Sequence, residues 1–540
     1  MSGETSKDTW WKTRSVYQIY PRSFRDANGD GVGDLAGITE GLRAVKALGA
    51  GIVWMSPIFR SPMVDNGYDM SGYREIDPLF GTMADFEALL AEAKRLDLKI
   101  VLDIALNHTS IDHPWFQAAL ADPTGPYRDY YIWRDKPNNW QSIFGGPAWS
   151  KPEGDPAYYL HLFDKTQADL NWENPAVRDE IYGAMRFWLD KGVSGFRLDV
   201  VTVISKPLGL PDAPDPRPMP LYHMLAGGPR LHEWLRDMRR EVFDLYDCVA
   251  IGEGPGLNPE RAAAIVNPAD PMLHMIYHFD FVDHTASRQG AGWDRVWFKS
   301  VFDRWDKGIG PDGWNSCVVG NHDLRRLIAR FGDAEADANL VAKALAASYV
   351  LQRATPFIYQ GDELGMGDTT ITSVEELDDV WAKTTYRLAK SKGNSEAEAL
   401  AKAVAMTRDH ARTPYPWTPE GGFGAGTPWL KPTPNRGGVD LATQQADEHS
   451  VWAFYRALLE LRAKDPETWV FGAYEDLLPE HESLFVYRRG VRGLVCMNLA
   501  SEPCPLPEKI LALLAKRSFI LASGDITTTQ MGPWSTQVWA

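Results

Sequence analysis

The sequence predicts an α/β protein whose main unit is a parallel (β/α)8 barrel. Up to residue 359, eight short apolar runs alternate with longer amphipathic segments, an order typical of such a barrel. The stretch between the third and fourth runs is too long for a loop, which indicates a small domain inserted after the third strand. After residue 464 the pattern changes to short strand-like runs, which indicate a C-terminal antiparallel β domain.

The eight apolar runs are the predicted barrel strands, and 273–277 is the least regular of them. They lie at 16–20, 51–55, 99–104, 195–198, 248–252, 273–277, 317–320 and 356–359. Apolar residues recur at helical spacing between them, which predicts amphipathic helices. These helices lie at 36–48, 83–96, 176–191, 230–246 and 336–352.

The domain boundaries follow from changes in composition along the chain. Residues 1–107 and 176–464 form the predicted barrel, and they include an irregular subdomain at about 365–435 that is helical over 373–405. Residues 108–175 are rich in Trp, Tyr, Pro, Asn and Gly, and they form the predicted inserted domain, called the B domain below. Residues 465–540 form the predicted C-terminal β domain, with strand patterns at 484–488 and 493–499.

Composition excludes several classes of partner. The net charge of −16 argues against nucleic acid or an anionic membrane surface as a partner. No apolar stretch approaches the roughly 18 residues of a membrane span, and the polar first eleven residues lack a signal region. The four cysteines form no Cys-x-x-Cys pair, so free thiols and a cytoplasmic location are predicted. Aromatic residues make up 11% of the chain, a weak indication of stacking against sugar rings.

Acidic residues follow three of the predicted strands: Asp199, Glu253 and Asp323. Because the carboxyl ends of barrel strands meet at one rim, we expect these three to share a pocket. Glycoside cleavage with retention uses two carboxyl groups about 5–5.5 Å apart, and a third carboxylate raises the pKa of the proton donor. Arg197 lies two residues before Asp199 and on the same face of the strand. Taken alone, this pair is equally compatible with a buried structural ion pair and with a nucleophile held ionised by arginine.

Several segments together resemble a known family. They are 17–24, 103–110, 195–201 and 321–326, together with the strand that ends at Glu253. In these segments the chain resembles glycoside hydrolase family 13, the α-amylase family, and most closely its α-glucosidase and oligo-1,6-glucosidase branch. The resemblance implies that Asp199 is the nucleophile, Glu253 the general acid and base, and Asp323 the stabiliser of the transition state. It also implies that Arg197 keeps Asp199 ionised and oriented.

The resemblance further implies a set of substrate-binding residues. Asp65 and Tyr68 would close the pocket at the non-reducing end of the sugar, which makes the enzyme exo-acting. In the segment 408–414, Arg412 would reach the same glucose and the neighbourhood of Asp65. The remaining residues implied to bind substrate are Phe163, Val200, and the hydroxyl-binding pair His108 and His322.

The predicted function is a retaining exo-α-glucosidase acting on short α-glucosides of the isomaltose, sucrose or maltose type. Val200 matches the oligo-1,6-glucosidase pattern, but an apolar residue there could equally admit sucrose. Sucrose isomerase, trehalulose synthase or a transglucosylase is the alternative. Residues 279–284 lack the arginine-rich loop of those enzymes, which favours water as the acceptor. A non-catalytic relative, such as a transporter heavy-chain ectodomain, is disfavoured because all three carboxylates are present.

The segment 26–34 predicts a structural metal site. It offers oxygen ligands at every second position, and the predicted ligands are Asp26, Asn28, Asp30, Val32 and Asp34. Such a set suits Ca²⁺, or Mg²⁺ with water completing its shell, although a solvated turn is the alternative. The resemblance supports metal binding, and no organic cofactor is expected. The expected partner is a small oligosaccharide or disaccharide, and the sequence leaves monomer and homodimer both open.

Overall fold

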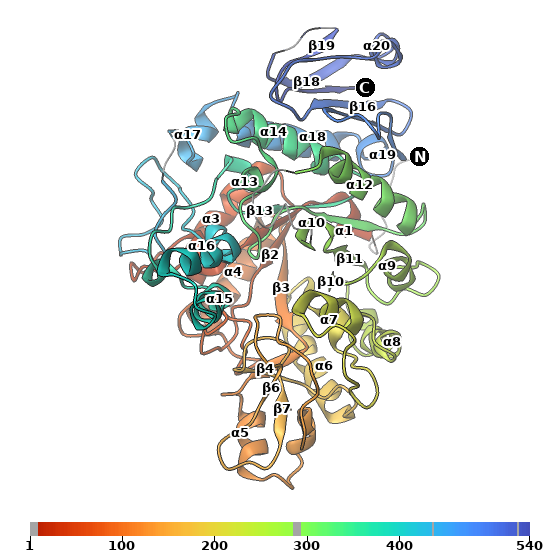
Figure 1. The fold of residues 1–540 in the computed structure, drawn as a ribbon. Helices are drawn as coiled ribbons and strands as arrows, with labels where there is room; N and C mark the ends of the chain where they lie inside the picture. Colours follow the sequence, from red (N-terminus) through yellow and green to blue (C-terminus); the bar gives the residue numbers. More distant parts are fainter. Residues whose placement is uncertain (1–8, 284–292, 435–436, 526, 528) are drawn as a thin grey trace.

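The computed structural model describes residues 9–540 except 284–292, 435–436, 526 and 528. At its centre is an eight-stranded parallel sheet with the order β11-β10-β9-β3-β2-β1-β13-β12. The end strands β11 and β12 also contact each other, so the sheet nearly closes and the predicted barrel is confirmed (Figure 1). The strands are β1 (Val16–Ile19), β2 (Ile52–Met55), β3 (Lys99–Ala105), β9 (Gly195–Asp199), β10 (Val249–Gly254), β11 (Met275–His278), β12 (Asn315–Val318) and β13 (Ala354–Tyr359).

Amphipathic helices surround this sheet, and capping side chains fix where several of them begin. Asp34 accepts a hydrogen bond from the Gly37 amide at the start of α3, and Thr82 and Asp85 form a capping box at the start of α4. The principal helices around the barrel are α3 (Leu35–Leu48), α4 (Met83–Arg95), α6 (Pro175–Asp190), α8 (Leu231–Glu241), α12 (Arg295–Ile309), α14 (Ala338–Val350) and α18 (Val451–Lys464). The helix predicted over 230–246 is shorter than expected, because the chain leaves α8 at Glu241 and continues as the 3-10 turn η4 (Phe243–Leu245).

Between β3 and α6 the chain leaves the barrel and forms small antiparallel sheets. One pairs β4 (His108–Ser110) with β8 (Gln167–Asp169), and the other has the order β5-β7-β6. The latter strands are β5 (Trp133–Arg134), β6 (Trp149–Ser150) and β7 (Tyr158–Leu160), with α5 (Pro114–Ala121) beside them. Figure 1 shows this part projecting from one end of the molecule.

The C-terminal part forms a five-stranded antiparallel sheet with the order β14-β15-β16-β20-β18, as the fold prediction requires. Its strands are β14 (Tyr474–Asp476), β15 (Leu484–Arg489), β16 (Gly493–Asn498), β18 (Phe519–Ser523) and β20 (Thr536–Trp539). Phe485 of this sheet stacks on Phe302 of α12, so the sheet and the barrel share one hydrophobic core. In the part of the chain that the structure describes, no helix combines the length and apolarity needed to cross a bilayer.

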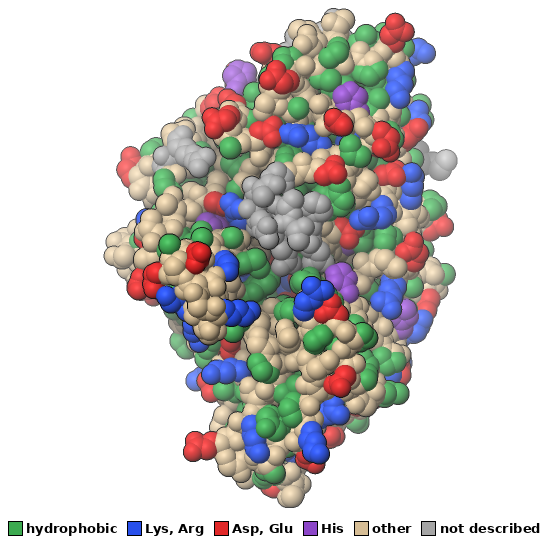
Figure 2. Space-filling view, in the orientation of Figure 1, with side chains coloured by type: hydrophobic (Ala, Val, Ile, Leu, Met, Phe, Trp, Pro, Cys, Tyr) green, Lys and Arg blue, Asp and Glu red, His purple; other side chains and the backbone are tan. Residues whose placement is uncertain are grey.

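A helical hairpin flanks the open end of the barrel. It consists of α15 (Val380–Ser391) and α16 (Glu396–Met406), which agrees with the helical pattern over 373–405. The hairpin brings Trp381 at its start and Met406 at its end to the mouth of the barrel pocket. Over most of the face in Figure 2, acidic and basic side chains are interspersed.

Candidate active site

Arg197 forms the electrostatic centre of the site. Its guanidinium lies 2.5 Å from Asp199, 2.6 Å from Glu253 and 2.8 Å from Asp103, and its side chain is fully buried. Strand order explains this cluster, because β9 is hydrogen-bonded between β3 and β10. Arg197 is paired in register with Asp103, so the two side chains leave neighbouring strands on the same side. The desolvation of one guanidinium is therefore offset by three carboxylates.

Two further groups orient Glu253. The Tyr277 hydroxyl accepts hydrogen bonds from Arg197 at 3.1 and 2.7 Å and donates one to Glu253 at 3.1 Å. The backbone amide of Val200 donates to the other oxygen of Glu253 at 2.7 Å. Val200 has φ 39° and ψ 37°, a left-handed conformation that is rare for a β-branched residue. This turn at the end of β9 points the Val200 amide toward the Glu253 carboxylate.

The three carboxyl groups around Arg197 are harder to ionise than in water. Burial raises the pKa of Asp199 and of Glu253, and it raises that of Asp103 to about 6. Arg197 opposes the rise in each case, but its single charge is shared among three acids. Asp323 adds to the rise at Glu253 by like-charge repulsion. Arg197 contacts Asp199 directly but does not bring the pKa of Asp199 down to its ordinary value, so its predicted role in orienting and ionising Asp199 stays a prediction.

Asp323 lies in the opposite electrostatic environment. Burial alone would raise its pKa, but the His322 ring and the guanidinium groups of Arg408 and Arg412 outweigh burial and hold the pKa below its ordinary range. Arg412 is 2.9 Å away, Arg408 is 3.3 Å away and His322 is 3.2 Å away. Asp323 is therefore ionised while Glu253 resists ionisation.

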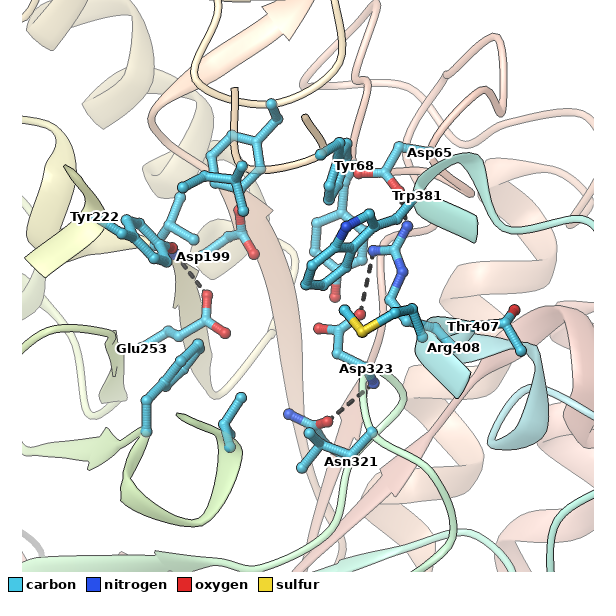
Figure 3. A pocket seen from close by; sticks show the side chains of 18 of the residues that line it. Asp65, Tyr68, Asp199, Tyr222, Glu253, Asn321, Asp323, Trp381, Thr407 and Arg408 are labelled. Atoms are coloured by element: carbon cyan, nitrogen blue, oxygen red, sulfur yellow. Dashed lines mark hydrogen bonds and ion pairs between the residues drawn. The ribbon is translucent and has the colours of Figure 1, made fainter. Parts of the chain in front are cut away.

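Asp65 and Arg408 close one end of the pocket. Arg408 contacts Asp65 at 2.7 Å and Asp379 at 2.6 Å, and Gln167 donates to Asp65 at 3.1 Å. In Figure 3, Asp65, Arg408 and Asp323 lie on the side of the pocket opposite Asp199 and Glu253. A sugar between these two groups would meet charged hydrogen-bonding partners at one end and the catalytic candidates at the other.

The structure brings most of the predicted site residues into one pocket. The predicted residues that line it are Asp65, Tyr68, His108, Phe163, Asp199, Val200, Glu253 and Asp323. Arg197, His322 and Arg412 are fully buried and do not line the pocket. They lie directly behind it, where His322 stacks on Tyr68 with ring centroids 5.4 Å apart. Arg412 donates to the His322 carbonyl, so it acts on the pocket through Asp323 rather than by reaching the sugar.

Sequence reasoning missed Arg408, Asp103 and Tyr277. Arg408 lies four residues before Arg412 in the same segment, and it makes the contact with Asp65. Asp103 begins the segment 103–110, but nothing in the sequence indicates that it lies beside Arg197 on the neighbouring strand. Tyr277 is the only hydroxyl-bearing residue of β11, the strand whose sequence pattern is the least regular.

The five predicted metal ligands lie together on the loop after β1. Asp26 accepts hydrogen bonds from the amides of Gly29 and Gly31, and Asp34 accepts from those of Ala27 and Asn28. The donor types suit a hard cation, and the glycines permit the turns. Across the described ranges, no three His, Cys, Asp or Glu side chains are grouped so that they could hold a metal. Calcium at this loop therefore stays a prediction.

Comparison with known proteins agrees with this geometry. Residues 18–470 match the alpha-amylase catalytic domain. The chain is 40% identical to an oligo-1,6-glucosidase of Parageobacillus thermoglucosidasius, with 98% of both chains covered, and 42% identical to an alpha-glucosidase of Pediococcus pentosaceus, with 89% of both covered. The structure of a trehalulose synthase from Pseudomonas mesoacidophila MX-45 superposes with a TM-score of 0.92 at 37% identity, covering 98% of this chain and 99% of that one. This chain belongs to the alpha-amylase family.

Proposed function

We propose that the protein is a retaining, exo-acting α-glucosidase that hydrolyses short α-glucosides through a covalent β-glucosyl intermediate on Asp199. The observation that carries the proposal is the position of Arg197, which holds Asp199 and Glu253 at 2.5 and 2.6 Å on one side of a pocket whose other end is closed by Asp65 and Arg408. The relatives named oligo-1,6-glucosidase and alpha-glucosidase support the same activity.

The first step transfers the glucosyl group to the enzyme. Glu253 gives its proton to the glycosidic oxygen while an Asp199 oxygen bonds to C1, and the bond from C1 to the leaving oxygen breaks. The reactive form carries the proton of this pair on Glu253 and the charge on Asp199, so the two groups titrate as a coupled unit. The raised pKa of Glu253 extends to higher pH the range over which this side chain holds the proton it donates.

The second step is hydrolysis of the intermediate. Water attacks C1, Glu253 accepts the proton of that water, and the bond to Asp199 breaks to restore the carboxylate. Asp323 is ionised and lies at the pocket surface, so it can accept hydrogen bonds from sugar hydroxyls as positive charge develops at C1. Asp65 and Arg408 line the pocket as an ion pair, and their position opposite Asp199 and Glu253 (Figure 3) supports exo action.

The substrates that fit are isomaltose-type, sucrose or maltose-type glucosides. The Val200 side chain lines the pocket beside Asp199, in a position to affect linkage preference. The neighbours titled trehalulose synthase and isomaltulose synthase support the alternative of sucrose isomerisation by the same double displacement. Of the segment predicted to separate these activities, His284 lies outside the described residues.

The substitution Asp199→Asn tests the central assignment. It keeps the size of the side chain but removes the nucleophilic charge, so kcat on maltose and isomaltose should fall by at least about 10³-fold. The thermal midpoint should stay within a few degrees, and Asp97→Asn is the matched control that should retain full activity, because Asp97 precedes β3 and pairs with Arg14. Substantial turnover by pure Asp199→Asn enzyme would contradict the assignment.

The products formed from sucrose distinguish hydrolysis, in which water is the acceptor, from isomerisation, in which the released fructose is the acceptor. Glucose and fructose in equal amounts indicate hydrolysis, whereas an isomeric disaccharide indicates an isomerase. The ratios of kcat/KM for isomaltose, maltose, sucrose and trehalose then give the linkage preference.

Two further features belong to the proposal. The loop 26–34 would hold Ca²⁺ or Mg²⁺ as a structural ion, supported by its four acidic and amide side chains and by the resemblance described above. A cytoplasmic location is supported by four free cysteines, of which Cys248, Cys317 and Cys496 are buried.

A further inference from the structure

Arg22 does not line the pocket, and the chemistry proposed above does not use it. It belongs to the short helix α2 (Pro21–Phe24), which follows β1, and its side chain is only 14% exposed. Its guanidinium lies over the ring of Trp429, with the Cζ atom 3.8 Å from the ring centroid. At this distance the cation and the indole attract each other. We call these two residues the Arg22–Trp429 pair.

The first connection from the Arg22–Trp429 pair to the pocket runs through Asn66. Arg22 donates a hydrogen bond to the Asn66 side-chain oxygen, and the Asn66 side-chain nitrogen donates to Asp378 at 3.1 Å. Asp378 also lies 3.9 Å from Arg22, so the three side chains form a closed cluster. Asn66 directly follows Asp65 and has φ 52°, a left-handed conformation that persists only where surrounding contacts hold it. Arg22 therefore stabilises the turn that carries Asp65.

The second connection is a series of nearly parallel rings. The centroids of Trp429 and Tyr20 are 6.3 Å apart, and those of Tyr20 and His322 are 5.8 Å apart. The His322 ring is within 6° of parallel to that of Tyr68, whose hydroxyl lies 2.7 Å from the Nε2 atom of His322. Tyr20 and His322 are buried, and Tyr68 lines the pocket. Because buried side chains are closely packed, a displacement of Trp429 would be transmitted to Tyr68.

Trp429 is itself fixed to the first barrel loop. Its indole N–H donates to the Ser23 hydroxyl at 3.0 Å, and its backbone amide donates to the Gly31 carbonyl at 2.9 Å. The Ser23 hydroxyl in turn donates to the Arg412 carbonyl. These bonds fix the position of the indole, so Trp429 gives the Arg22 guanidinium a rigid surface to pack against.

We propose that Arg22 and Trp429 are positioning residues for the end of the pocket that binds the transferred glucose. Their two connections end at Asp65 and Tyr68, which line that end of the pocket. Neither connection includes Glu253, which acts on the leaving group. The pair therefore sets the affinity for the transferred glucose and leaves the choice of linkage unaffected. This inference rests on the proposed α-glucosidase function.

The substitution Arg22→Met tests the inference, with D-glucose as a probe that occupies only the site of the transferred sugar. The variant loses a charge-assisted bond to Asn66, so the inhibition constant for D-glucose should rise about tenfold. KM for maltose, isomaltose and sucrose should rise by the same factor, so the ratios of kcat/KM between these substrates stay as in the wild type. A merely structural role would lower the active fraction, which reduces kcat and leaves KM and the inhibition constant unchanged.

The outcomes separate this inference from the proposed function. If the wild type hydrolyses maltose and Arg22→Met has the wild-type inhibition constant for D-glucose, the inference alone is overturned. If the wild type hydrolyses no α-glucoside, the proposed function is overturned and the inference with it.

Arg25→Met is the matched control. Arg25 lies three residues after Arg22, and its guanidinium also lies over an indole, 5.0 Å from the Trp417 ring centroid. It pairs with Glu40 at 2.9 Å instead of with Asn66. Arg25→Met should therefore leave the inhibition constant for D-glucose within about twofold of the wild type. A tenfold rise in this control would show that the effect is not specific to the Arg22–Trp429 pair, and would overturn the inference.

Variants of Trp429 test the second member of the pair, and they decide the question if Arg22→Met fails to fold. Trp429→Leu removes the ring and should raise the inhibition constant for D-glucose about fivefold, whereas Trp429→Phe keeps an aromatic face and should recover most of the affinity. In the double variant Arg22→Met/Trp429→Leu, the rise should be smaller than the product of the two single effects, because the two side chains are in contact. A wild-type constant in Trp429→Leu, or a double variant that shows the full product, would overturn the pair.

Discussion

At the scale of single residues, the site depends on backbone geometry as much as on side chains. Val200 adopts a left-handed conformation, which costs a β-branched residue of order 1–3 kcal/mol. The gain is a direct hydrogen bond from its amide to Glu253. Val200 was predicted to act through its side chain alone, because backbone strain of this kind leaves no pattern in the sequence.

Tyr277→Phe should move the alkaline limb of the pH profile of kcat/KM. The hydroxyl donates to Glu253 and therefore stabilises its ionised form. Without that donor the pKa of Glu253 rises further, so its proton is kept to higher pH and the limb shifts upward by about 0.5 pH unit. Tyr131→Phe is the control, because the Tyr131 hydroxyl contacts Thr109 and none of the catalytic acids. A limb that stays in place or moves to lower pH would show that Tyr277 does not act on Glu253.

The predictable part of the site follows from barrel topology. The positions of Asp199, Glu253 and Asp323 at strand ends were enough to place them on one rim, since parallel strands share that rim. Which of two arginines meets Asp65 was not predictable. Arg408 and Arg412 are four residues apart on one turn that begins with η7 (Arg408–His410), so spacing places both on the same side. Only the packing of the folded chain shows that Arg408, and not Arg412, lies at the pocket surface next to Asp65.

At the scale of elements, the loop between β2 and α4 carries the closed end of the pocket. Asp69 is fully buried and accepts hydrogen bonds from the amides of Val64 and Asp65 at 2.9 and 3.0 Å. Met63 and Asn66 have positive φ, so the loop turns sharply on both sides of Asp65. Asp69 is therefore a positioning residue for Asp65.

Asp69→Asn should raise KM more than it lowers kcat. The Asn side chain replaces one carboxylate oxygen with an NH2 group, so one hydrogen bond from the backbone of this loop to a charged acceptor is lost. Such a bond contributes about 1.5–3 kcal/mol, and with Asp65 held less firmly KM for isomaltose should rise about tenfold. Asp77→Asn is the matched control: Asp77 accepts from the amides of Ser61 and Leu79 at the base of the same loop. It should lower stability similarly while leaving KM unchanged. Equal KM values in the wild type and in Asp69→Asn would rule out the positioning role.

The strands of the barrel were easier to predict than its helices. Each of the eight apolar runs contains or overlaps an observed strand, because buried parallel strands are apolar on both faces. Helix α12 was not predicted from its sequence, in which Trp, Lys and Asp interrupt the apolar residues. Lys299 lies on the buried face of α12, where its ammonium donates to the carbonyls of Leu478, His481 and Leu484. These acceptors lie far along the chain in the C-terminal part, so the local sequence gives no indication that a lysine belongs on the buried face.

At the scale of the whole molecule, the loop 26–34 joins distant parts of the chain. The Asp26 amide donates to the Phe423 carbonyl and the Trp429 amide donates to the Gly31 carbonyl, both at 2.9 Å. A metal on this loop would therefore stabilise the contact between the first barrel loop and the segment 423–429. Its contribution would be to stability, because the loop does not line the pocket.

Calcium should raise the thermal midpoint of metal-stripped protein by a few degrees. Saturation at about 100 times Kd contributes about 2.7 kcal/mol. Asp30→Ala should abolish the rise, whereas Asp135→Ala, in the B domain, should retain it. Elemental analysis of the purified protein and titration with Mg²⁺ identify the ion. A midpoint that does not respond to either cation would exclude the predicted site.

The junction between the barrel and the C-terminal sheet contains two buried arginines, Arg462 and Arg489, for which the described side chains include no ion-paired acid. Arg489 of β15 donates to the carbonyls of Leu351, Val470 and Gly472, and Arg462 of α18 donates to those of Val350 and Trp469. Several of these carbonyls lie at the ends of α14 and α19 (Pro466–Trp469), where the helix dipole is negative.

Arg489→Met should therefore loosen the C-terminal sheet from the barrel. It leaves several buried carbonyls without donors, at a cost of about 3 kcal/mol, although it also removes the desolvation cost of the guanidinium. Arg488→Met is the matched control. Arg488 precedes Arg489 on β15, but its side chain is exposed and pairs with Glu475, so Arg488→Met should lower the free energy of unfolding by less than about 0.5 kcal/mol. Urea unfolding measures both, and limited proteolysis should cut Arg489→Met first near residues 465–472. Equal stability of the two variants would show that packing such as Phe485 on Phe302, and not the buried arginine, holds the sheet to the barrel.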